Sequence, residues 1–179
     1  MKILATTLVL AVAVLPLWGE GLDAAVQPKV DAQIKLVQAW AADPVIVAAV
    51  KTGNAGQPGD LATMTQDKWK SLSILDPAVR GFTKNAAAEF IKGKKSDVVS
   101  ESFLSAADGT KVAFLTKPTN WCHKGKPKHE EPMAGKTWQG PVEVDDSTGL
   151  QQVQVSVPVI DGGKPIGSLV VGLSISKLN

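Results

Sequence analysis

Hydrophobic and polar residues alternate through the C-terminal half of the chain. Between residues 152 and 159 valine takes every second position, and glutamine or serine fills most of the others. Because successive side chains of a strand point to opposite faces, this pattern predicts a strand with one apolar and one polar face. The alternation returns at residues 169–175 after Asp161-Gly162-Gly163, a sequence typical of a hairpin turn. With further strands near residues 103, 111–116 and 138–144, we expect a meander of about five antiparallel strands.

The N-terminal half has helical spacing instead. Apolar residues recur at intervals of three and four between Val30 and Ala41, which predicts a helix. Asp43-Pro44 interrupts it, because aspartate caps a helix and proline fits the first helical position of a second one. Thr65 is expected to cap a short helix, and Asp76-Pro77 to start one that runs to about Ile91. Helices first and strands afterwards favour an α+β fold, with the helices on one face of the sheet.

The first 25 residues have the layout of a secretory signal peptide. Lys2 is followed by an uncharged apolar run, Ile3 to Trp18, and then by small residues at positions 19–25. This run is shorter than the ~20 residues that cross a bilayer. We expect a signal peptide at residues 1–24, a single domain at residues 25–179, and a periplasmic or secreted protein. A retained N-terminal anchor helix is the alternative.

Charge and cysteine content exclude some classes. The formal net charge is only +2, so nothing points to nucleic acid as a partner. Cys122 is the only cysteine, which excludes an internal disulfide. The chain has no Gly-x-Ser-x-Gly elbow, no His-Glu-x-x-His pair and no phosphate-binding glycine loop. We therefore expect no enzymatic activity and no cofactor.

The candidate chemistry is concentrated between Lys117 and Lys136. This segment holds five lysines, both histidines, the only cysteine and Trp121, and Trp138 lies two residues beyond it. Ammonium groups around an indole suit a small anion, because the charges neutralise a carboxylate while the ring packs on its apolar part. A solvated loop, kept soluble by its lysines, is the alternative interpretation.

Cys122, His123 and His129 support a second hypothesis, a metal- or haem-binding periplasmic protein. A thiolate and two imidazoles are three of the four ligands of a zinc or copper site, and Glu130, Glu131 or Met133 lies close by as a fourth. The spacing matches no standard motif, and Cys122-His123 lacks the upstream cysteine of a covalent haem site.

Several segments together resemble a known family. They are ADPVIVAAV (42–50), QDKWKSL (66–72), FLSAADGTKVAF (103–114), TKPTNW (116–121), VSVPV (155–159) and GKPIGSLVVGL (163–173). This order resembles the single Cache, or PDC, PAS-like sensor domains of bacterial chemoreceptors and histidine kinases. The resemblance implies a five-stranded antiparallel sheet with a long N-terminal helix on one face and a small-molecule pocket on the other.

The resemblance and the composition of the Lys117–Gln139 segment together define the expected site. The resemblance also implies an acidic residue at the pocket mouth, at Asp145, although Asp145-Asp146 is equally ordinary turn chemistry. The expected ligand-binding residues are Lys117, Thr119, Trp121, Lys136, Trp138, Gln139 and Asp145. The expected function is non-catalytic binding of a small, anionic metabolite.

Two hypotheses describe how binding is used. The liganded form docks on a membrane receptor or histidine kinase, or the protein sequesters a metabolite; the sequence favours neither. The resemblance further implies that the long N-terminal helix can serve as a homodimer contact.

Overall fold

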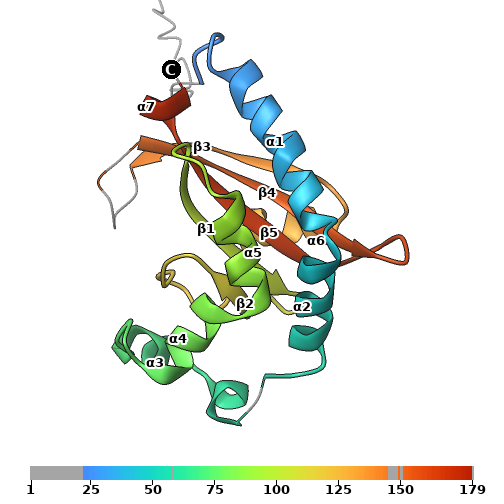
Figure 1. Ribbon diagram of the computed structural model, residues 1–179, viewed down its shortest axis with the longest axis vertical. Helices are drawn as coiled ribbons and strands as arrows, with labels where there is room; N and C mark the ends of the chain where they lie inside the picture. The colour runs from blue at the N-terminus through green and yellow to red at the C-terminus, as the bar shows by residue number, and fades with distance from the viewer. Residues whose placement is uncertain (1–21, 58, 145–148, 150, 179) are drawn as a thin grey trace, which may run out of the picture.

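The computed structural model describes residues 22–57, 59–144, 149 and 151–178. Most of the expected signal peptide, and Asp145, lie outside these residues. The described chain builds one five-stranded sheet in the order β2-β1-β5-β4-β3, in which all neighbours are antiparallel (Figure 1). The strands are β1 (Val99–Ala106), β2 (Lys111–Phe114), β3 (Trp138–Val144), β4 (Gln151–Asp161) and β5 (Lys164–Ser174). The predicted α+β class with five antiparallel strands is confirmed.

The strand order differs from the simple meander that we predicted. β3, β4 and β5 follow one another as a meander, but β1 pairs with β5 and places the β1–β2 hairpin at the far edge. Alternation along a strand specifies its two faces and carries no information about its neighbours. The sequence pattern therefore does not predict that β1 pairs with β5.

Helices make up most of the N-terminal half. They are α1 (Gln27–Ala41), α2 (Pro44–Asn54), α3 (Gln66–Ser71), α4 (Pro77–Lys84), α5 (Ala86–Lys94), α6 (Pro127–Met133) and α7 (Ile175–Leu178), with a 3₁₀ helix η1 (Gly59–Thr63). The side chains of Asp43, Thr65 and Asp76 accept hydrogen bonds from the first turns of α2, α3 and α4, so all three predicted caps are confirmed. α6 and α7 were not predicted.

The apolar face of the sheet packs against α1, α2 and α5, which lie in front of it in Figure 1, with α2 continuing from the end of α1. The four alternating valines of β4 are fully buried here. They meet Leu169, Val171 and Leu173 of β5 and the inward residues of the helices, Val37 and Ile46 among them. This layer is the main hydrophobic core.

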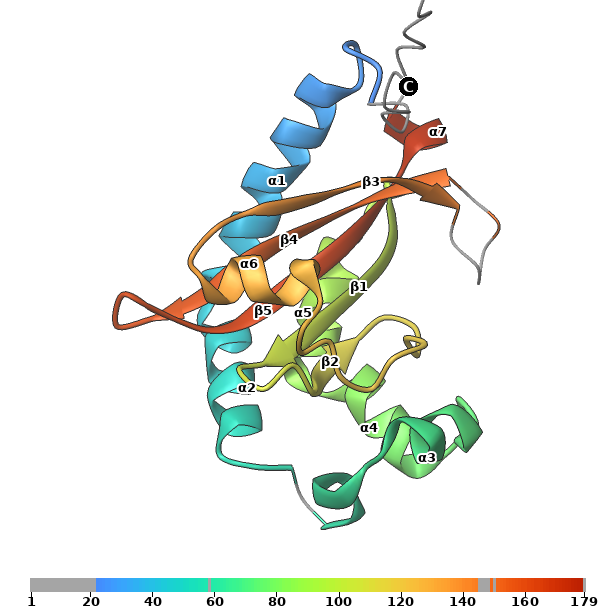
Figure 2. The same cartoon turned by 180° about the vertical axis from the view of Figure 1, so that it is seen from behind.

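The opposite face of the sheet is polar and is covered as well. α6 crosses β4 and β5 on this side, as Figure 2 shows. Beneath it Gln154, Ser156 and Ser168 are buried, and Ser156 donates a hydrogen bond to the Lys128 carbonyl at 2.6 Å. The predicted polar face of the strand is therefore confirmed, but it lies inside the protein. Buried polar side chains need partners, and this face is where the candidate site lies.

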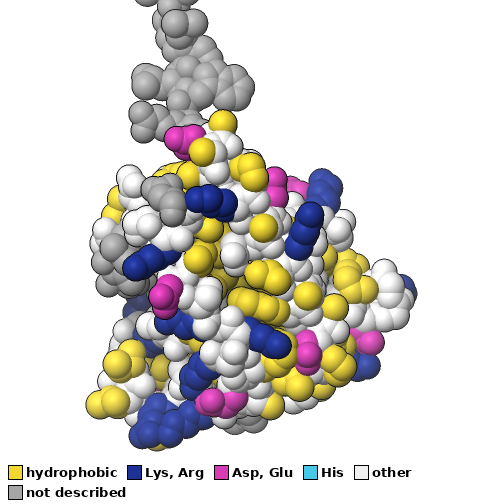
Figure 3. Space-filling view, turned by 45° about the horizontal axis from the view of Figure 1, so that its top comes forward, with side chains coloured by type: hydrophobic (Ala, Val, Ile, Leu, Met, Phe, Trp, Pro, Cys, Tyr) yellow, Lys and Arg dark blue, Asp and Glu magenta, His cyan; other side chains and the backbone are white. Residues whose placement is uncertain are grey.

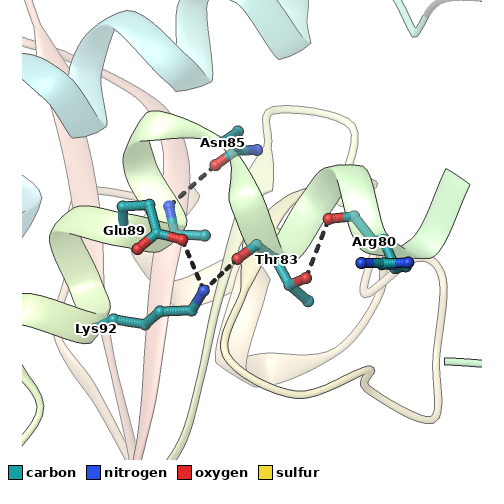
Figure 4. A network of polar contacts seen from close by, with 6 residues as sticks. Arg80, Thr83, Asn85, Glu89 and Lys92 are labelled. Carbon is teal, nitrogen blue, oxygen red and sulfur yellow. Dashed lines mark hydrogen bonds and ion pairs between the residues drawn. The ribbon is translucent and has the colours of Figure 1, made fainter. Parts of the chain in front are cut away.

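The predicted helix from Asp76 to Ile91 is wrong, because it is two helices. Asn85 has an extended backbone between α4 and α5, and its Oδ1 accepts from the Ala88 amide at 2.9 Å. Figure 4 shows the corner: Thr83 donates to the Arg80 carbonyl, and Lys92 Nζ donates to the Thr83 carbonyl at 2.6 Å and pairs with Glu89. Asparagine competes with helical hydrogen bonding through this capping geometry.

Substitution of Asn85 by alanine is expected to lower the free energy of unfolding by about 1–2 kcal/mol. The substitution removes the cap of α5 and the hydrogen bond from Nδ2 to the Val112 carbonyl, 2.8 Å long. Urea unfolding measures the change. Asn85→Ser is the matched control, since its hydroxyl keeps a cap acceptor and only the bond to Val112 is lost, so it should cost less. Equal stability of the alanine variant and the original protein would contradict this role.

Among the described residues, no single helix combines the length and apolar character needed to cross a membrane. α1 and α2 pass that test only when they are joined, and they bend by 65° at the break between them.

Candidate functional site

A polar pocket of about 280 Å³ opens on the α6 side of the sheet. Its lining comes from β1, the end of β3, the start of β4, residues 116–123, and α6. The lining residues are Ser100, Glu101, Phe103, Thr116, Lys117, Pro118, Thr119, Asn120, His123, Lys128, Glu143, Val144, Gln152 and Gln154. Ligand pockets commonly enclose about 300–1,000 Å³, so this pocket suits a molecule at the small end of that range.

The floor of the pocket is a hydrogen-bonded network between strands. Glu101 of β1 accepts from the side-chain amides of Gln152, at 2.9 Å, and of Gln154. Lys128 of α6 donates to the amide oxygen of Gln154, which joins the helix to the strand. Burial lowers the pKa of Lys128, and the neighbouring Glu101 carboxylate opposes that shift. The network leaves a partly buried ammonium group on the pocket wall, where it can meet an anion.

α3 holds the outer wall of the pocket in place. Trp69 Nε1 donates to the Pro118 carbonyl at 2.8 Å, and Gln66 Nε2 donates to the Thr119 carbonyl at 2.9 Å. Gln66 Oε1 also accepts from the Trp121 amide. Trp69 is fully buried and packs edge-on against Phe82 and Phe114. The residue 116–121 segment is thus fixed by side chains that are about 50 positions earlier in the chain.

Lys117 lies on this outer wall. Its ammonium group sits 4.8 Å from the centre of the Trp69 ring, a cation–π contact that orients it. Burial lowers the pKa of Lys117. The pocket therefore carries Lys117 on one wall and Lys128 on the other.

A buried lysine–histidine pair lies behind the pocket. Lys111 Nζ is 2.5 Å from His123 Nδ1, and it lies over the Phe103 ring, on which His123 is stacked. Burial lowers the pKa of Lys111 to about 7 and that of His123 to about 2, the latter with a contribution from Lys111 itself. His123 is therefore neutral at pH 7. In the form in which Lys111 is protonated, its ammonium group donates to Nδ1, so the ring hydrogen is on Nε2 and His123 is a donor.

The backbone places His123 through the β1–β2 hairpin. The His123 amide donates to the Gly109 carbonyl at 2.9 Å. Gly109 has φ +86°, and a Cβ there would lie 2.4 Å from the Lys124 nitrogen. Only glycine permits this close approach in the left-handed region. The Asp108-Gly109 turn thereby positions a pocket residue.

The structure distributes the predicted ligand-binding residues over several environments. Lys117 and Thr119 line the polar pocket. Trp121 is buried in the aromatic cluster with Trp69 and Phe82. Ligand contact by Lys117 and Thr119 stays a prediction.

Lys136, Trp138 and Gln139 are not among the described residues that line this pocket. Lys136 is exposed and pairs with Glu131 at 3.2 Å. Trp138 is half-buried, 6.0 Å from Lys128 Nζ, and Gln139 is hydrogen-bonded to Gln27 of α1. Asp145 lies outside the described residues. Because adjacent residues of a strand point to opposite faces, Trp138 lies on the α6 side of the sheet and Gln139 on the α1 side.

The predicted metal ligands do not converge. Within residues 22–57, 59–144, 149 and 151–178, no three cysteine, histidine or acidic side chains gather as a metal site. Cys122 Sγ contacts the Asp108 carbonyl, and His123 contacts Lys111. His129 is fixed between Ser168 Oγ, at 2.8 Å, and the Ala107 carbonyl, at 3.2 Å. His129 anchors α6 to the sheet.

The floor of the pocket was missed because it lies far from the lysine-rich segment in sequence. Glu101, Gln152 and Gln154 come from β1 and β4. Lys128 is one of the five lysines between Lys117 and Lys136, and composition does not distinguish it from the other four. The signal was present: glutamines alternating with valines mark a polar strand face. The pattern does not show that α6 covers this polar face of the strand.

No protein-family model matches this chain, and no curated protein matches it. Among solved structures, the sensor domain of the Vibrio cholerae histidine kinase DctB matches at 15% identity and a TM-score of 0.50, over 86% of this chain and 53% of that one. The ligand-binding domain of the Pseudomonas aeruginosa amino acid chemoreceptor PctC, in complex with GABA, matches at 14% and 0.48, over 86% and 58%. That of the Pseudomonas fluorescens chemoreceptor CtaA, with L-valine, matches at 14% and 0.47, over 86% and 57%.

At such identities the DctB match shows the fold alone. The chain has the PAS-like fold of a single Cache sensor domain, as the resemblance implied. It spans about half the length of the DctB domain.

Proposed function

We propose that this protein is a non-catalytic, sensor-like protein that binds a small anionic metabolite in the polar pocket beneath α6. The observation that carries the proposal is a polar strand face, buried under a helix, that opens into a pocket with Lys117 and Lys128 on its walls. A sheet face of this kind is costly to bury unless polar groups find partners. A buried polar sheet face that opens into a pocket therefore favours recognition of a polar ligand.

The charges favour an anion over a cation. Glu101 is already engaged by two glutamine amides, and Glu143 is exposed at the pocket edge. Lys128, Lys117 and the ring N–H of His123 are donors. A carboxylate placed between them gains charge-assisted hydrogen bonds in a partly desolvated site. The small volume favours a metabolite of a few heavy atoms.

The proposal also includes the location of the protein and its partners. We infer removal of residues 1–24 as a signal peptide and a periplasmic or secreted domain at residues 25–179. The sensor domain of the histidine kinase DctB shares the fold, which supports docking of the liganded form on a membrane receptor or histidine kinase. Sequestration of the metabolite without a partner, and a homodimer through α1, also stay predictions.

Thermal unfolding with matched ligands tests the proposal. Acetate, pyruvate and succinate are compared with the uncharged acetamide, pyruvamide and succinamide. A ligand at about 100 times its dissociation constant adds about 2.7 kcal/mol, which raises the Tm by several degrees in a domain of this size. We expect at least one carboxylate to raise the Tm and its amide to have no effect. A Tm that responds to none of the carboxylates contradicts the proposal.

Substitution of Lys128 by methionine is expected to weaken carboxylate binding at least tenfold. Methionine keeps the volume of the side chain and removes the ammonium group beside Gln154. The matched control is Lys124→Met, which makes the same change of net charge at an exposed position that does not line the pocket. Titration calorimetry measures both. Equal weakening in the two variants would assign the effect to net charge instead of to the site.

A further inference from the structure

A second hollow, of about 580 Å³, lies on the helical side of the protein. It is bounded by α2, α4, α5, β2 and the segment after α2. Its lining residues are Val45, Ala48, Ala49, Thr52, Gly53, Gly56, Gln57, Leu61, Ala78, Gly81, Phe82, Asn85, Ala86, Ala87 and Val112. It shares no lining residue with the polar pocket. Figure 3 shows that hydrophobic side chains reach the surface on the helical side, between scattered lysine and acidic groups.

Small residues create this hollow. Eight of the fifteen described residues that line it are alanine or glycine: Ala48, Ala49, Gly53, Gly56, Ala78, Gly81, Ala86 and Ala87. At Gly53 a Cβ would lie 2.6 Å from a methyl of Val112, so α2 can approach β2 only with glycine there. A Cβ at Gly81 of α4 would meet nothing within 4 Å, so there is open space beside this helix. Protein interiors are otherwise close-packed, and larger side chains on these helices would fill the space.

The corner between α4 and α5 keeps this wall in position. Asn85 lines the hollow, caps α5 and donates to the Val112 carbonyl, while the Lys92 contacts to Thr83 and Glu89 lock the two helices together (Figure 4). The hollow is therefore held open by a hydrogen-bonded frame.

The chemistry of the walls specifies the class of occupant. No charged residue occurs among the described residues that line the hollow. Its polar side chains are engaged elsewhere: Gln57 donates to the Lys111 carbonyl at 3.0 Å, and Thr52 donates to the Ala48 carbonyl at 3.1 Å. A charged ligand would lose its hydration here without compensation. An apolar one would gain from leaving water.

We propose that this hollow is a second binding site, which takes a small, uncharged, apolar molecule. Its volume lies within the range of small-molecule sites, about 300–1,000 Å³. The site is independent of the polar pocket in its residues and in the charge of its ligand.

The aromatic cluster connects the hollow to an optical signal. Phe82 lines the hollow, and its ring centre is 6.2 Å from that of Trp69 and 5.6 Å from that of Trp121. An occupant that touches Phe82 therefore changes the surroundings of two buried indoles. Tryptophan fluorescence should report binding.

Titration with 1-octanol, followed by tryptophan fluorescence, tests the site. Ala86→Leu and Ala78→Leu fill the hollow with side chains that helices accept. Ala39→Leu is the matched control, an exposed alanine of α1 that does not line the hollow. We expect saturable binding to the original protein and to Ala39→Leu, and at least tenfold weaker binding to both filled variants. Circular dichroism checks that each variant is folded.

Three results overturn the proposal. The first is the absence of a saturable change in the original protein, and the second is equal affinity in folded filled variants. The third is a dimer, detected by sedimentation, that dissociates on Ala86→Leu, since a second copy would then occupy the hollow. Lys128→Met should bind 1-octanol normally, so failure of the polar pocket leaves this test intact.

Discussion

Replacement of Trp69 by alanine is expected to lower the free energy of unfolding by about 3–5 kcal/mol. The indole is fully buried and contacts Phe82, Phe114 and Trp121. Its removal leaves a cavity and an unpaired Pro118 carbonyl. Since small domains are stable by only about 5–15 kcal/mol, the loss is a large share of the total. Denaturant unfolding, with its midpoint and slope, measures it.

The same variant should also weaken ligand binding, because Trp69 holds the outer wall of the polar pocket and orients Lys117. Trp69→Phe separates the loss of packing from the loss of the hydrogen bond, because it keeps an aromatic ring in the cluster and loses only the bond to the Pro118 carbonyl. Trp138→Ala is the control for tryptophan loss in general, because that indole is half-buried on β3, outside the cluster. Similar destabilisation by Trp138→Ala and Trp69→Ala would contradict the assigned role.

Replacement of Lys111 by methionine is expected to stabilise the protein at pH 7 by about 1–3 kcal/mol. Lys111 is fully buried, and the ion pairs of the described residues do not include it. Methionine removes the cost of burying the ammonium group or of deprotonating it on folding. The gain is reduced because His123 Nδ1 loses its donor, which costs about 1 kcal/mol or more.

The pH dependence provides the decisive check on Lys111. Its pKa is about 7 in the folded protein and 10.5 when the group is unperturbed. Between these values the unfolded chain binds more protons, so the stability of the original protein should rise with pH, by up to about 1.4 kcal/mol per unit. In Lys111→Met this rise should be clearly smaller, with the remainder coming from Lys117 and Lys128, whose pKa values burial also lowers. Lys124→Met, at an exposed position, should leave it unchanged. The same slope in Lys111→Met as in the original protein would show that Lys111 is not the source.

Local features of the fold were predictable from sequence because they depend on neighbouring residues. The caps Asp43, Thr65 and Asp76 act within one helical turn, and the valines of β4 face one side by geometry alone. The pairing of β1 with β5 depends on contacts between distant segments, which single-strand patterns do not encode. The break at Asn85 was missed because asparagine is tolerated inside helices as well as at their caps.

The candidate site was only partly predictable for a related reason. Composition drew attention to the lysine-rich segment, which supplies Lys117, Thr119, His123 and Lys128 to the pocket. Composition does not show which way a side chain points, and Trp121, close to Lys117 in sequence, is buried among aromatic rings instead. α6 was missed because its sequence contains Pro127 and Pro132, both of which lie in the helix. The buried polar floor follows from that helix.

In the proposed function a small anion binds between Lys117, Lys128 and His123. The most direct test is NMR of the two imidazole rings during titration with acetate, pyruvate and succinate. His123 lines the pocket, whereas His129 is held by Ser168 and Ala107 and serves as an internal reference. We predict a saturable shift of the His123 resonance with at least one carboxylate, little change at His129, and loss of the response in Lys128→Met. If neither resonance moves with any of the three anions while the protein is folded, the pocket does not bind small carboxylates.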